Sequence, residues 1–389
     1  MTSSGADMVD WNLAVATATR LVRPGPDISP DEARAVVAEL RQHAAESEQH
    51  VRSFTKMSSP DGGTPVLVVD RPGWIKANVA GFSQLLQPLA EKMAAKRSAA
   101  VGGSFVGTVG GKITGLELGM LLAFLSSRVL GQYETFAPTA PQIAPAAAGQ
   151  GTEASGDATT GDAPPKAGRL LLVAPNVVHV ERELDVDPHD FRLWVCLHEE
   201  THRTQFTAVP WLRDHIEGEI QTFLAETEMD PATLFERARE AVQAMSGSSE
   251  ESGEGGGHSS SPSLVELVQT PAQREILDRL TAVMSLLEGH ADYVMDGVGP
   301  QVVPSVKEIR EKFAQRRKQG TGRLDQALRR LLGLDAKLRQ YQEGERFVRG
   351  VVDAVGMDGF NRVWTSPNTL PSRDEINDPS AWVSRVAHK

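Results

Sequence analysis

The 389-residue chain has one cysteine, few aromatic residues and no long apolar run. The single cysteine, Cys196, cannot form an intramolecular disulfide and leaves no cysteine pair for a zinc site, so we expect a reducing, cytoplasmic location. No basic start followed by an apolar run opens the chain, which predicts no signal peptide. The most apolar stretch, residues 118–125, is too short to cross a bilayer, so we expect no membrane partner.

Positive charge is also in short supply. Lysine and arginine total 40 against 51 aspartate and glutamate residues, which gives a formal charge of -11. A chain with this balance is repelled by the phosphates of nucleic acids and by anionic lipid, so we expect no nucleic-acid partner. The sequence carries no signal for a particular oligomeric state.

Two stretches lack the large apolar side chains that a folded core requires. Residues 137–168 are rich in alanine, proline, glycine and threonine, and residues 246–263 are rich in serine, glycine and glutamate. Both are predicted to be low-complexity insertions. The rest of the chain is treated as one domain over residues 1–389.

Local signals predict a mainly α fold with a few short strands. Helix starts with a capping side chain followed by proline occur at Ser29-Pro30, Asp187-Pro188 and Thr270-Pro271. Short strands are expected at residues 66–69 and 169–174, where β-branched and leucine residues run together. The second of these strands is either a core strand or an edge to which an extended substrate adds.

The helix that begins at Asp187 leads into His198-Glu199-Glu200-Thr201-His202, an HExxH motif. Residues four apart lie about 40° apart around a helix, so both imidazoles project from one face and can share a zinc ion. Glu199 lies about 100° from His198, where it can serve as general base without binding the metal. Glu200 and Arg203 are three apart and are expected to pair.

A third zinc ligand is expected in the helix that begins at Thr270-Pro271. Glu288 and Asp292 lie four apart on one face, so Glu288 can bind the metal while Asp292 accepts a hydrogen bond from a metal-bound histidine. His290 is the competing ligand. It lies about 200° from Glu288, so a regular helix favours Glu288.

These motifs carry a resemblance to a known family. The runs DFRLWVCLHEETHRTQFTAVPWLRDH, VDRPGWIKANVAGF, GRLLLVAPNVV, LLEGHADYVMD and GMDGFNRVWTSPNTLPSRDEI resemble the zincin-like metallopeptidases of actinobacteria, which are classed as hydrolases. One branch of that family is labelled as associated with the biosynthesis of a deazaflavin coenzyme. The resemblance covers nearly the whole chain except the two insertions, and it implies a mostly helical zincin-like fold with an HExxH zinc site.

The expected function is therefore a zinc-dependent, metallopeptidase-like hydrolase that cleaves a peptide or other amide bond in a peptide or protein substrate. The alternative is a zinc-stabilised, catalytically silent protein with an interaction or regulatory role. The two differ in whether Glu199 takes part in turnover, so a metal assay followed by a broad peptide screen separates them.

Overall fold

The computed structural model describes residues 9–58, 64–99, 104–136, 168–226, 270–319 and 334–387. The insertion predicted at 246–263, and all but Gly168 of the one predicted at 137–168, lie outside these ranges. The chain divides into two compact units, residues 1–210 with 290–335 and residues 211–289 with 336–389. The sequence predicts a single domain over residues 1–389, and that remains a prediction.

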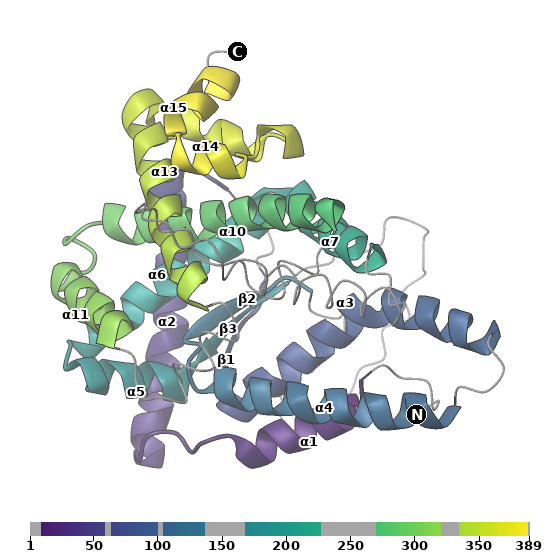
Figure 1. Cartoon of the computed structure of the whole chain (residues 1–389). Helices are drawn as coiled ribbons and strands as arrows, with labels where there is room; N and C mark the ends of the chain where they lie inside the picture. Colours follow the sequence, from purple (N-terminus) through teal and green to yellow (C-terminus); the bar gives the residue numbers. More distant parts are fainter. Residues whose placement is uncertain are drawn as a thin grey trace, which may run out of the picture. The chain divides into compact units, whose positions relative to one another are not determined.

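The first unit contains a small sheet and most of the long helices (Figure 1). Helix α1 packs along α4, and α2 packs along α6. Its helices are α1 (Trp11–Leu21), α2 (Pro30–Thr55), α3 (Arg71–Ala99), α4 (Ser104–Ser126), α5 (Ala174–Leu184), α6 (Pro188–Ala208), the last turns of α10 (Pro271–Gly297) and α11 (Val306–Gln319).

The sheet has three strands in the order β1 (Val66–Val69), β3 (Arg169–Val173) and β2 (Gly131–Glu134). Strand β1 pairs with β3 in parallel, and β2 pairs with β3 in antiparallel register. The strand expected at 169–174 is therefore the central one, and the idea that it offers a free edge to a substrate is wrong because both of its edges are already paired.

Strand β3 is buried because helices cover both of its faces. Leu172 belongs to a core formed with α2, α5, α6 and α11, while Leu171 and Val173 belong to a core formed with α1, α3 and α4. Successive side chains of a strand point to opposite faces, so a run of leucines serves two helical layers at once. The apolar side of α6 packs in the core that contains Leu172.

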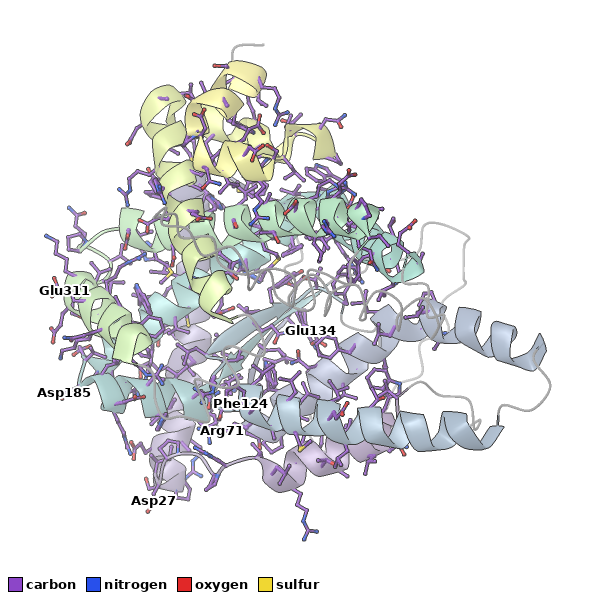
Figure 2. All side chains as sticks on the ribbon, in the orientation of Figure 1. Asp27, Arg71, Phe124, Glu134, Asp185 and Glu311 are labelled. Atoms are coloured by element: carbon purple, nitrogen blue, oxygen red, sulfur yellow. The ribbon has the colours of Figure 1, made fainter. Side chains whose placement is uncertain are left out.

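Polar side chains tie the sheet to its surroundings (Figure 2). Glu134 at the end of β2 pairs with Arg169 of β3. Buried Arg71, the first residue of α3, donates to Asn176 Oδ1 at 2.7 Å and to the carbonyl oxygens of Arg23 and Pro24. These bonds satisfy a charged group that would otherwise be costly to bury.

The three helix starts predicted from capping residues are confirmed. Ser29 Oγ accepts from the backbone N–H of Glu32 at 3.1 Å, and Asp187 Oδ1 accepts from that of Asp190 at 2.9 Å. At Thr270 the cap is reciprocal, because Gln273 Oε1 accepts from the Thr270 N–H at 3.0 Å. Each cap satisfies backbone donors that the first helical turn leaves without an internal partner.

The second unit is helical in the part that the structure describes. Trp382 is fully buried in it and donates from Nε1 to the Thr369 carbonyl at 2.8 Å. Its elements are α7 (Pro210–Ala225), most of α10, α13 (Leu334–Phe360), η1 (Asn361–Trp364), η2 (Pro367–Thr369), α14 (Arg373–Asn377), α15 (Pro379–Trp382) and η3 (Val383–Ala387). Among the described helices, none has the length and apolar character needed to cross a membrane.

Candidate metal centre

Helix α6 brings the two histidines of the HExxH motif together. The rings of His198 and His202 are perpendicular, with centroids 4.7 Å apart, and their Nε2 atoms lie 3.2 Å from each other. The capped start of α6 at Asp187 and the packed core side of the helix fix the face from which both rings project. Both side chains are half-buried.

The far nitrogen of each ring faces a hydrogen-bond acceptor. His202 Nδ1 lies 2.9 Å from Gln205 Oε1, and His198 Nδ1 lies 3.0 Å from the sulfur of Met295 on α10. An amide oxygen and a thioether sulfur only accept, so both Nδ1 atoms carry the proton. In their neutral form the two rings would then direct the lone pairs of their Nε2 atoms, which lie 3.2 Å apart, toward each other.

This arrangement fits a shared metal ion. Two ligand atoms bound to zinc at about 2.0–2.1 Å in tetrahedral geometry lie about 3.3 Å apart, close to the 3.2 Å between the two Nε2 atoms. Two lone pairs at this distance repel each other unless a cation or a proton lies between them. The donor chemistry is therefore that of a metal site, with imidazole nitrogens held from behind in the tautomer that binds metal.

His290 takes part in the chain of hydrogen bonds behind the histidines. Gln205 Nε2 donates to His290 Nδ1 at 3.1 Å, which orients the amide so that its oxygen faces His202. His290 is fully buried, and burial, with a smaller contribution from nearby His202, lowers its pKa to about 3. A neutral His290 can accept the hydrogen bond from Gln205 at Nδ1. The Gln205 amide therefore links His290 to His202.

The acidic residues of α10 lie one turn apart. Asp292 is buried, and Arg310 donates to its backbone oxygen at 2.8 Å and lies 3.8 Å from its carboxylate. Glu288 precedes Asp292 by four residues on the same helix. The division between the two units falls between Gly289 and His290, so Glu288 is grouped with the second unit.

Glu199 is buried against strand β2. A Cβ atom added to Gly131, the first residue of β2, would lie 2.4 Å from Glu199 Cγ and 2.8 Å from its Oε1. No side chain larger than hydrogen fits there unless Glu199 moves. Because Gly131 has no side chain, the Glu199 side chain can occupy the space beside β2. Nothing in the local sequence around Gly131 indicates this role.

Glu200 points to a different partner from Glu199. Arg203 Nε lies 2.7 Å from Glu200 Oε2, so the expected pairing is confirmed, and Arg203 also reaches Glu48 of α2 at 2.8 Å. Burial raises the pKa of Glu200 to about 7, against the opposing effect of Arg203. The contact between Arg203 and Glu48 joins α6 to α2, and the buried Cys196 thiol lies in the core near Leu40.

The comparisons with known proteins agree with this chemistry. Residues 9–383 match the family described as zincin-like metallopeptidase. A crystal structure described as a "putative hydrolase with a novel fold" from Chloroflexus aurantiacus is 31% identical, with a TM-score of 0.64, and the match covers 97% of this chain and 98% of that one. No curated protein matches the chain. Because the family match spans nearly the whole chain, the protein belongs to the zincin-like metallopeptidase family.

Proposed function

We propose that the protein is a zinc hydrolase that cleaves a peptide or other amide bond, with His198, His202 and Glu288 as the zinc ligands. The observation that carries the proposal is the pair of Nε2 atoms 3.2 Å apart, with both Nδ1 atoms held by acceptors. Family membership supports a metallopeptidase-like hydrolase, and the donor set supports zinc.

The choice of Glu288 as third ligand is supported by positions along α10. Glu288, Asp292 and Met295 follow one another at intervals of four and three, so they share one face of this helix. Met295 on that face contacts His198 Nδ1. Glu288 is therefore the α10 carboxylate that we propose as the third ligand, beside His198 and His202.

Bound zinc supplies Lewis acidity, which polarises the carbonyl of the scissile amide and activates water for attack. The chain's own residues do the rest. Glu199 follows His198 directly on α6, and its buried carboxylate is the group that takes the proton of the attacking water and passes it to the leaving amine. Asp292 is proposed to orient the metal-binding side chains, and Arg310 lies 3.8 Å from its carboxylate.

The substrate is proposed to be a peptide or protein, and the single buried cysteine keeps a reducing, cytoplasmic location as our expectation. The test is a broad peptide-substrate screen of the purified protein and of Glu199→Gln. The glutamine cannot accept a proton, so we expect this variant to retain its zinc and to lose hydrolysis by at least about 100-fold.

Two results would count against this assignment. Unchanged hydrolysis in Glu199→Gln excludes Glu199 as the base. A zinc-loaded protein that cleaves nothing in the screen favours the catalytically silent reading, in which the metal only stabilises an interaction or regulatory protein.

A further inference from the structure

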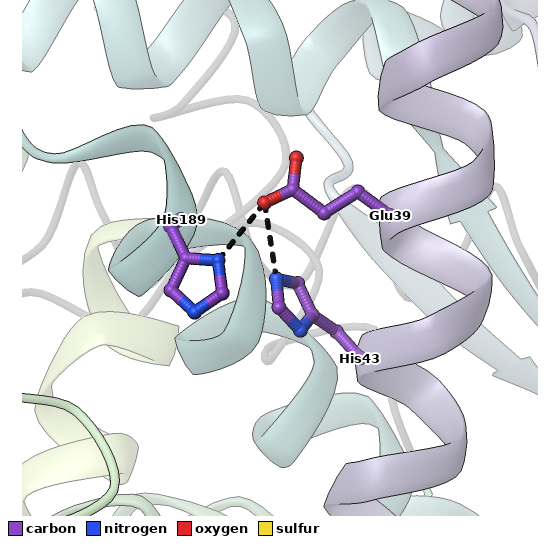
Figure 3. Close-up of side chains that lie close together, drawn as sticks. All are labelled: Glu39, His43 and His189. Carbon is purple, nitrogen blue, oxygen red and sulfur yellow. Dashed lines mark hydrogen bonds and ion pairs between the residues drawn. The ribbon is translucent and has the colours of Figure 1, made fainter.

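A second group of histidine and glutamate side chains lies between α2 and the start of α6 (Figure 3). Glu39 and His43 come from α2 and His189 comes from the first turn of α6. His189 precedes His198 by nine residues, so this cluster lies about 14 Å from the HExxH pair along the helix axis. The proposed zinc site shares none of these three residues.

One oxygen of Glu39 contacts both histidines. Glu39 Oε1 lies 3.3 Å from His43 Nε2 and 3.1 Å from His189 Nδ1, as the dashed lines in Figure 3 show. The two rings meet edge to face, with centroids 4.6 Å apart. Ligand atoms around one tetrahedral zinc ion are about 3.3 Å apart, so two of the three separations already match such an ion.

His43 is fully buried, and each of its ring nitrogens faces a carboxylate. Its Nδ1 lies 3.1 Å from Glu46 Oε2, and its Nε2 faces Glu39. A neutral imidazole has one N–H, so one of these nitrogens directs a lone pair at a carboxylate oxygen. Either a second proton or a metal ion at Nε2 resolves this conflict. A carboxylate behind a metal-bound histidine, as Glu46 would be, is a recurrent arrangement in metal sites.

The charges around the cluster favour a divalent cation. Arg192 binds the other oxygen of Glu39 and also pairs with Glu181. Burial raises the pKa of Glu39, but hydrogen bonds from Arg192 and His189 lower it overall, and hydrogen bonds from Gln42 and His43 lower the pKa of Glu46. The carboxylates of Glu39, Glu46 and Glu181 outnumber the one guanidinium that hydrogen-bonds to them, that of Arg192, so negative charge remains to attract a cation.

We propose that Glu39, His43 and His189 bind a second metal ion, a divalent transition metal such as zinc, which joins α2 to the first turn of α6. Two imidazoles and a carboxylate are the ligand types that zinc takes in proteins. The side chain of His189 is 63% exposed, so the ion can enter from solvent and keep a water ligand on that side. The ion holds in place the end of α6 that lies before the HExxH motif.

Zinc titration of the metal-stripped, full-length protein tests this proposal. We expect two zinc ions per chain for the natural protein and one for His189→Ala, which removes an exposed ligand and leaves the core intact. His179→Ala is the matched control, because His179 is a half-exposed histidine on neighbouring α5 that pairs with Glu183 at 3.8 Å. This control should still bind two.

His202→Ala separates this site from the proposed catalytic one. It should retain the zinc ion that His189→Ala loses, and added zinc should raise its melting temperature but not that of the double variant His189→Ala/His202→Ala. Equal zinc uptake by the natural protein and by His189→Ala overturns the proposal. It would mean that a second proton on His43, rather than a metal, bridges the carboxylates.

Discussion

The Nε2 atoms of His198 and His202 face one another because their Nδ1 atoms are held from behind by Met295 and Gln205. The sequence predicts the two histidines and their common face, since a helix repeats every 3.6 residues. It does not predict the partners on α10, because Met295 and His290 reach α6 across long stretches of chain. The contact of His198 with Met295 and that of Gln205 with His290 set the tautomers of the two metal-binding rings. Both contacts join residues that are far apart in the sequence.

Gly131 is the second feature that only the fold reveals. A methyl group at this position would lie within 2.4–2.8 Å of the Glu199 side chain, so Gly131→Ala should push the carboxylate aside. We expect hydrolysis to fall at least about tenfold while zinc content is unchanged, since a misplaced base loses much of its effect.

Gly218→Ala is the matched control for Gly131→Ala, because an added Cβ at Gly218 on α7 meets nothing within 4 Å. Its zinc content and activity should equal those of the natural protein. Full activity in Gly131→Ala would show that Glu199 does not depend on the space beside β2.

Helix starts were predictable because they depend on neighbouring residues. The caps at Ser29, Asp187 and Thr270 need only a side-chain oxygen and a proline or glutamine within the next three positions. Strand order was not predictable in the same way. A strand was predicted at residues 169–174, and β3 spans 169–173, but its central position depends on β1 and β2, which pair with it across more than 30 residues of chain.

Helices α10 and α13 cross in the second unit at two glycines. A Cβ on Gly289 would lie 2.1 Å from the carbonyl carbon of Gly344, and one on Gly344 would lie 1.9 Å from the Ser285 oxygen. Since the obstacles are backbone atoms, neither helix can yield by a side-chain rotation. We expect Gly289→Ala to destabilise the protein by roughly 1–3 kcal/mol, as overpacking does.

Thermal or urea unfolding measures this effect, again with Gly218→Ala as the control. Alanine favours a helix over glycine by about 1 kcal/mol, so the control should be as stable as the natural protein or more so. If Gly289→Ala behaved like Gly218→Ala, the close approach of α10 and α13 would be contradicted.

Across the whole molecule, the mainly α fold expected from the sequence is confirmed, as is the family. The family match over residues 9–383 shows that the HExxH helix is one part of a scaffold as long as the described chain. The sequence gives the weakest support for the choice of the α10 residue that completes the proposed zinc site. Glu288 and His290 are only two positions apart, and helix periodicity separates them only if α10 presents the expected face.

The most direct test of the central claim is therefore a competitive zinc titration of Glu288→Ala, Asp292→Ala and His290→Ala. All three are made in the His189→Ala background, so that the second cluster does not contribute, and their folding is checked by thermal melts. We predict that Asp292→Ala weakens zinc binding by about 10- to 100-fold and that Glu288→Ala weakens it further. His290→Ala, which removes the acceptor of the Gln205 amide, should weaken it by less than about tenfold. A larger loss in His290→Ala than in Glu288→Ala would contradict the proposed ligand set.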